Sequence, residues 1–219
     1  ILGPSVISPA WSSNQSIPFN FNFNGSPVNQ YTVSSTGVLT FNVGATTAPS
    51  SSNTALPSGS IPDNSVCIWG IEASGPNDEV LTKTFGSSPD RQHWVFFTSH
   101  SLNGGGGYWS IVMEESSDRI YIVDQRNQGT SGGVSMGIQI DGSTAISVTG
   151  SPSVLPESGN SETTSDNLYY EFVYGVQPAI DGELLTFETP SYVNVTNNII
   201  KGDIKNLGSS TITSIDLNY

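Results

Sequence analysis

The chain has 219 residues, a formal net charge of −13 and only six Lys and Arg residues. Nucleic acids and anionic membrane surfaces bind clustered basic side chains, so this balance excludes nucleic acid as an expected partner. No run approaches the roughly 18 apolar residues of a membrane-spanning helix, so membrane insertion is not expected either. Hydrophobic residues make up 35% of the chain, which is enough to build a folded core.

Two further features of the composition concern location. Charged residues make up 11% of the chain, against about 25% in an average globular domain. A surface of Ser, Thr, Asn and Gly in place of Lys and Glu indicates a secreted or cell-surface protein. The single cysteine, Cys67, excludes a disulfide within these residues, and its apolar neighbours predict a small buried side chain.

Short extended segments separated by turn residues follow one another along the chain, and no amphipathic helix of useful length interrupts them. Phe19, Phe21 and Phe23 alternate with Asn, which places three rings on one face of a strand. The Asn24-Gly25 pair that follows is a turn signal. The expected strands are 19–23, 31–35, 37–43, 66–73, 79–86, 92–102, 108–116, 119–127, 135–141, 145–150 and 167–175.

The clearest single pattern is the hairpin over residues 108–127. In its second half Ile120 and Ile122 point to one face, and Tyr121 and Val123 point to the other. Many short strands at this spacing, joined by Gly-rich and Asn-rich turns, are typical of a sandwich of two antiparallel sheets. The predicted fold class is therefore all-β, with a jelly-roll-like antiparallel β-sandwich as the first domain.

This first domain is predicted to span residues 1–177, and the tail over 183–219 repeats the strand pattern. The tail is too short for a whole Ig-like sandwich of about 100 residues. It is therefore predicted to be a partial Ig-like β region or a set of additional strands. Its expected strands are 183–189, 192–196, 199–205 and 212–219.

Several of these segments together carry a family resemblance. In order along the chain they are IPFNFNFNG (17–25) leading into YTVSSTGVLTF (31–41), HWVFF (93–97), SIVMEESSDRI (110–120) and VSMGIQIDG (134–142). Over residues 15–175 the chain resembles β-sandwich modules of large secreted or cell-surface proteins of Bacteroidota, and more distantly the extracellular nidogen-like domain. The tail over 192–213 resembles the opening of an Ig-like adhesive or spacer domain. The resemblance implies export, commonly by the type IX route, and display at the cell surface.

No catalytic residues come with this resemblance, and the titratable residues form no catalytic pattern of their own. His93 and His100 are seven positions apart in one strand, which places them on opposite faces unless a bulge intervenes. Glu114 and Glu115 are adjacent and face opposite ways, so they cannot form a glycosidase pair. The chain is therefore predicted not to be an enzyme.

Calcium is the one metal that the sequence suggests. Hard cations bind carboxylate, amide and backbone oxygens in irregular loops, and Asp63, Asp78 and Glu79 lie near predicted strand ends. Their spacing is not that of an EF-hand. The alternative is that these are solvated turn acids.

Glycans bind to exposed aromatic side chains flanked by polar groups. Trp69 and Trp94 lie in apolar runs that predict a core position. Trp109 lies shortly after the glycine run at 104–107, which predicts a flexible loop. Asn103, Tyr108 and Trp109 are therefore predicted to bind a ligand. The alternative for Trp109 is packing in the core.

These observations predict a non-enzymatic extracellular surface module for adhesion to a glycan or a protein partner. One alternative is an accessory binding domain of a larger secreted hydrolase. Another is a structural spacer or filament subunit, whose terminal strands pair with neighbouring copies of the chain.

Overall fold

A computed structural model describes residues 1–3, 6, 8–102, 105–128, 132–155, 168–175, 179–180, 182–188, 201–206, 208 and 210–215. Every helix or strand assigned among these residues is a β-strand, which confirms the predicted all-β class. The chain divides into two compact units, Ile1–Tyr174 and Gly175–Tyr219. Each unit is described by itself.

One sheet of the first unit has six strands in the order β1-β2-β3-β4-β9-β10, and all neighbours are antiparallel. Asn24 and Gly25 join the first two strands with φ angles of 49° and 74°, the left-handed backbone that a tight hairpin turn requires. The strands are β1 (Gln15–Phe23), β2 (Ser26–Val33), β3 (Val38–Thr40), β4 (Ser65–Trp69), β9 (Ser135–Asp141) and β10 (Thr144–Ser147).

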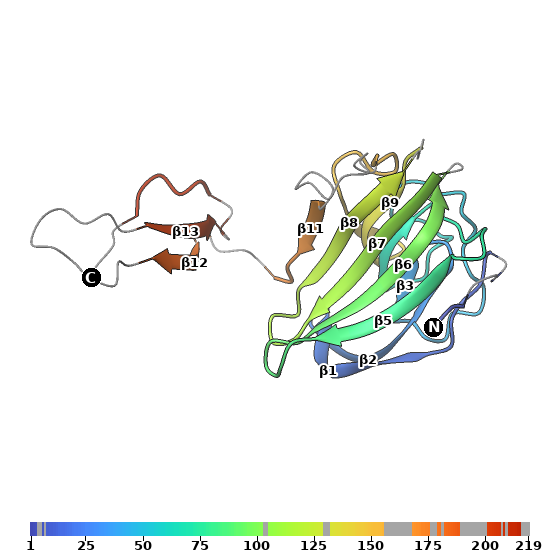
Figure 1. Ribbon diagram of the computed structural model, residues 1–219, viewed down its shortest axis with the longest axis horizontal. Coiled ribbons are helices and arrows are strands. Elements are labelled where there is room, and N and C mark those ends of the chain that lie inside the picture. Colours follow the sequence, from blue (N-terminus) through green and yellow to red (C-terminus); the bar gives the residue numbers. More distant parts are fainter. Residues whose placement is uncertain are drawn as a thin grey trace, which may run out of the picture. The chain divides into compact units, whose positions relative to one another are not determined.

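The other sheet of this unit has five antiparallel strands in the order β11-β8-β7-β6-β5. Its four consecutive strands are neighbours, so they form a meander. Figure 1 shows this sheet in front of the six-stranded sheet, which makes the unit a β-sandwich. The strands are β5 (Glu79–Phe85), β6 (Gln92–Leu102), β7 (Gly105–Glu114), β8 (Ile120–Gln128) and β11 (Leu168–Phe172).

The main hydrophobic core lies between the two sheets and follows from strand alternation. Phe19, Phe21 and Phe23 are all buried, as their spacing predicts. Ile120 and Ile122 are also buried, whereas the two residues that alternate with them are only half-buried. The strands of the two sheets, except β10, thus contribute alternate side chains to one shared core.

The outer face of the six-stranded sheet is covered by the loop over residues 44–63. Ile61 from this loop packs with Cys67 and Trp69 in a second, smaller core. The side-chain amide of the fully buried Gln139 donates to the Ile61 carbonyl at 2.8 Å, which fastens the loop to β9. Burial raises the pKa of the Cys67 thiol, and the predicted small buried side chain is confirmed.

One predicted loop is a strand instead. Residues 105–107 begin β7, where they pair with residues 100–102 of β6. Two of these glycines also pair with β8. Main-chain hydrogen bonds need no side chain, so a glycine run between two strong strands can continue the sheet.

The second unit contains a two-stranded antiparallel sheet of β12 (Gly182–Glu188) and β13 (Lys201–Asn206). These strands overlap two of the four segments expected in the tail, 183–189 and 199–205. The expected strand at 192–196 lies outside the described residues, and residues 212–215 are described without a strand. Leu184 and Ile204 are exposed. The Ig-like nature of this tail stays a prediction.

Candidate functional site

The outer face of the five-stranded sheet differs from that of its partner sheet, because no described segment of the first unit crosses it (Figure 1). Several large apolar side chains are therefore open to solvent there. Their exposed fractions are 44% for Leu81, 48% for Phe85, 40% for Tyr108 and 52% for Tyr169. A contiguous exposed apolar surface on a soluble protein commonly marks an interaction site.

The centre of this surface is built by β5 and β6. Trp94 and Phe96 are two residues apart on β6, so both point outward, and their rings stack with centroids 5.4 Å apart and planes 21° from parallel. Phe85 of β5 meets Trp94 edge to face at 6.2 Å. We call Leu81, Phe85, Trp94, Phe96 and Tyr108 the aromatic face.

A β-bulge in β8 adds polar groups to one edge of the aromatic face. Tyr108 pairs with Arg126, but the next residue, Trp109, pairs with Asp124, so Gln125 is an extra residue in β8. Gln125 accepts a hydrogen bond from the Ser110 hydroxyl at 2.8 Å. A shallow groove beside this bulge is lined by Phe96, Phe97, Thr98, Tyr108, Gln125 and Arg126.

The structure corrects two sequence-based expectations about tryptophan. Trp109 is 0% exposed and packs in the main core, so it offers no ring face to a ligand. Strand alternation instead points its neighbour Tyr108 outward into the groove. Trp94, expected in the core, lies on the outer face and is half-buried. Asn103 lies outside the described residues.

The reason why Trp94 was expected in the core is visible in the sequence. Both alternating sets of residues 92–97 contain large apolar side chains, so the pattern of β6 alone does not say which set faces the core. The neighbouring strand does contain that signal. Lys83 is exposed and pairs with Trp94, which marks the Trp94 side as the outer face.

The three residues predicted to bind calcium have separate surroundings. Asp78 as a residue is 5% exposed. Its carboxylate accepts hydrogen bonds from the backbone N–H groups of Ser74 at 2.6 Å and Gly75 at 2.7 Å. Asp63 is exposed in the loop before β4, and Glu79 begins β5. The described residues contain no group of three or more His, Cys, Asp or Glu side chains that could hold a metal ion. The Asp78 contacts are those of a turn acid.

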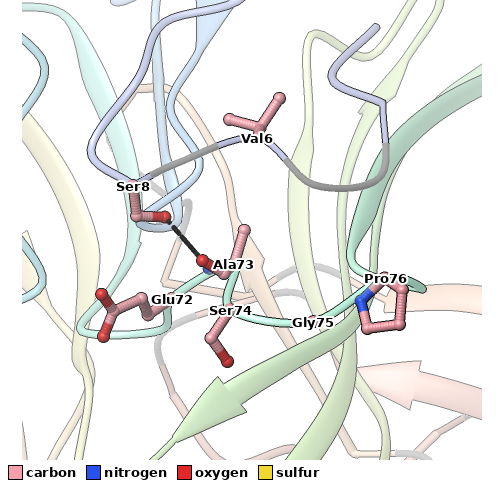
Figure 2. A pocket seen from close by; sticks show the side chains of 7 residues that line it. All are labelled: Val6, Ser8, Glu72, Ala73, Ser74, Gly75 and Pro76. Atoms are coloured by element: carbon pink, nitrogen blue, oxygen red, sulfur yellow. Dashed lines mark hydrogen bonds between the residues drawn. The ribbon is translucent and has the colours of Figure 1, made fainter.

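A second groove lies between the N-terminal segment and residues 72–76 (Figure 2). Ser8 closes one side of it, since its hydroxyl donates to the Ala73 carbonyl at 3.2 Å and accepts from the Ala73 N–H at 3.1 Å. The Ser8 hydroxyl also bonds to Ser35 at 2.9 Å. These contacts fasten the N-terminal segment to the sandwich, so this groove is explained by packing.

Both histidines are buried inside the first unit. The register of β6 is irregular between Phe97 and His100, which brings His100 to the same face as His93. His93 contacts the Tyr31 hydroxyl and the Thr84 hydroxyl, each at 2.9 Å. Burial lowers the pKa of His93 to about 4 and also lowers the pKa of His100.

We therefore expect the His93 imidazole to stay neutral in the folded protein between pH 8 and pH 6. A lowered pKa means that folding favours the neutral form. The contribution of His93 to stability is therefore fully present above about pH 6.5 and is lost as the pH falls toward 4. In a proton NMR titration the Hε1 signal of His93 should not move between pH 8 and pH 6, and that of His100 should move at a lower pH than the signal of an ordinary histidine. A midpoint near 6.5 for either signal would contradict this placement.

The acidic residues Glu114, Glu115 and Asp124 of the 108–127 hairpin have separate surroundings. The Arg91 guanidinium binds both oxygens of Glu115 at 2.7 Å, and these hydrogen bonds lower the pKa of Glu115 to about 2. Asp124 is 2% exposed. Glu114 accepts hydrogen bonds from the side chains of Gln92, Ser117 and Tyr121.

Fold and surface together define an all-β sandwich module with one covered and one open outer face. A model of the NIDO-related family matches residues 8–189, which is most of the chain, and the chain belongs to this family. It is thus an extracellular-type module, compatible with non-enzymatic binding. No curated protein and no solved structure shows significant similarity to the chain. The described residues include no helix with the length and apolar character needed to cross a bilayer.

Proposed function

We propose that this chain is a non-enzymatic extracellular adhesion module that binds a glycan on its aromatic face. The observation that carries the proposal is the stacked pair of Trp94 and Phe96, which lies on an uncovered sheet face beside a polar groove. Large open apolar surfaces are uncommon on soluble proteins unless they bind something.

The chemistry of the aromatic face suits a sugar ring. A pyranose ring has an apolar C–H face, which packs on the electron-rich face of an aromatic ring, and a rim of hydroxyls that need hydrogen-bond partners. Trp94 and Phe96 stack on each other, so each offers a sugar the part of its ring that the other does not cover. Thr98, Gln125 and Arg126 supply donors and acceptors along the groove.

The aromatic face is also pre-organised, which lowers the entropic cost of binding. Trp94 contacts Phe85 and Phe96 at once, so its ring is held before a ligand arrives. The Trp94 indole N–H also donates to the Gln92 side chain at 3.2 Å. A rigid aromatic surface loses little conformational entropy when the C–H face of a sugar ring packs on it.

A protein partner was the other class expected from the sequence. A stable protein interface buries about 800 Å² on each side, and it usually has an apolar centre with a polar rim. Here the polar bulge lies directly beside Tyr108, along a shallow groove, which suits a chain of sugar rings better. An accessory domain of a secreted hydrolase would use the same face, so that alternative changes what the module is attached to and not how it binds.

Replacing both Trp94 and Phe96 by Ala should weaken glycan binding by at least about 10-fold, because both rings of the stacked pair are lost. The measurement is binding to a glycan array, followed by titration calorimetry with the best oligosaccharide. Tyr174→Ala is the matched control, because Tyr174 is 59% exposed and lies outside the strands of this sheet. Circular dichroism checks that each variant is folded. Absence of glycan binding by the wild type, or undiminished binding by the double variant, would contradict the proposal.

A further inference from the structure

We propose that the glycan bound on the aromatic face is acidic, carrying carboxylate or sulfate groups that contact Lys83 and Arg126. This inference rests on the proposed function, since it concerns the ligand of the same face. Its support is the distribution of the few basic side chains in a strongly acidic chain.

The first unit contains four of the six basic side chains, and two of these are used in ion pairs. Arg91 binds Glu115 at 2.7 Å, and Arg119 lies 3.3 Å from Glu171. Lys83 and Arg126 make no ion pair with any described residue. Both are exposed, so their charges are available to a ligand.

Both of these cations lie on the outer face of the five-stranded sheet. Lys83 of β5 pairs with Trp94, and Arg126 of β8 pairs with Tyr108. They are separated by three inter-strand spacings across the sheet and by four residues along it, a distance on the order of 20 Å. The stacked pair of Trp94 and Phe96 and the groove lie between them. A ligand that contacts both cations therefore crosses the aromatic rings.

The acidic side chains on the same face do not cancel this charge. Glu171 forms an ion pair with Arg119. Glu114 lies at the end of β7 that is distant from Arg126, and it accepts three side-chain hydrogen bonds there. Glu79 is half-buried at the start of β5, three strands from Arg126. The net charge of −13 opposes the approach of an anion to the molecule as a whole, so an anionic ligand needs a local group of unpaired cations. The aromatic face is thus the place where an anionic ligand meets unpaired cations.

Matched oligosaccharides test this inference. The probes are an oligogalacturonate and its methyl ester, in which each charged carboxylate is replaced by a neutral ester, and a sulfated oligosaccharide and its desulfated form. We expect the wild type to bind at least one acidic member about 10-fold more tightly than its neutral partner, because charge-assisted hydrogen bonds are the stronger ones. That preference should shrink as NaCl is raised from about 50 to 300 mM, since salt screens exposed charges.

The double variant Lys83→Gln, Arg126→Gln should lose the preference, so that acidic and neutral partners bind it equally. Lys201→Gln, Lys205→Gln removes the same charge from the second unit and should behave as the wild type. Equal binding of acidic and neutral partners by the wild type would overturn the inference while leaving the proposed function standing, provided that binding still depends on Trp94 and Phe96. An acidic preference that survives Lys83→Gln, Arg126→Gln would overturn it as well. Binding to no glycan would overturn both proposals.

Discussion

Replacing Trp109 by Ala is expected to lower the free energy of unfolding by about 3–5 kcal/mol. Trp109 is 0% exposed and contributes one of the largest fully buried side chains of the main core. It lies on β7, which has a neighbouring strand on each side, so the surrounding backbone has little room to collapse into the cavity. Its indole N–H has no hydrogen-bond partner among the described residues, so the loss is one of packing. Urea denaturation followed by circular dichroism measures it.

The neighbouring residue provides the control. Tyr108 points to the outer face and is 40% exposed, so Tyr108→Ala should cost less than about 1 kcal/mol. The two variants remove similar aromatic side chains from adjacent positions of one strand. Equal losses for both would mean that the assignment of the two faces of β7 is wrong.

Gly37→Ala is expected to destabilise the protein by about 3 kcal/mol, through backbone strain and overpacking together. Gly37 has a φ of 88°, a conformation that side chains with a Cβ rarely adopt. An added Cβ would also clash with the carbonyl oxygen of Ile68. The backbone cannot shift freely to avoid this clash, because the Ile68 N–H donates to the Gly37 carbonyl at 2.8 Å. Thermal and urea denaturation measure the change.

Gly59→Ala is the matched substitution for this experiment. Gly59 has no heavy atom within 4 Å of an added Cβ and no left-handed backbone, so we expect a change within about 0.5 kcal/mol. Similar stability of the two variants would contradict the tight approach of β3 to β4 at Gly37.

Local patterns predicted most of the strands of the first unit because each strand contains its own signal. The Phe residues at 19, 21 and 23 alternate with Asn, and the core does receive these rings. The Asn24-Gly25 turn has the left-handed backbone that its composition favours. At such positions the neighbours in sequence are enough to decide the structure.

The candidate site was harder to predict because it depends on pairing between strands. Trp94 and Trp109 both lie in runs where each face is apolar, and only the partner strands decide which side faces the core. The bulge at Gln125 follows from the register of β7 against β8, and no local residue pattern announces it. Of the two neighbours predicted to bind a ligand, Tyr108 lies on the outer face and Trp109 lies in the core.

The difference between the two outer faces also depends on contacts between distant parts of the chain. The loop over 44–63 covers the six-stranded sheet through Ile61, which accepts a hydrogen bond from Gln139, 78 residues further along the chain. No comparable segment covers the five-stranded sheet in the described part of the first unit. One sheet thus has a second small core, and the other has the aromatic face.

The most direct test of the aromatic face as a binding site is fluorine NMR of the chain labelled with 5-fluorotryptophan. The four tryptophans give four signals, and Trp94→Phe assigns the signal of interest. On titration with an oligosaccharide that binds on the array, the Trp94 signal should shift in proportion to occupancy, while the signals of the buried Trp69 and Trp109 stay in place. A saturating ligand that leaves the Trp94 signal unmoved would contradict binding on the aromatic face.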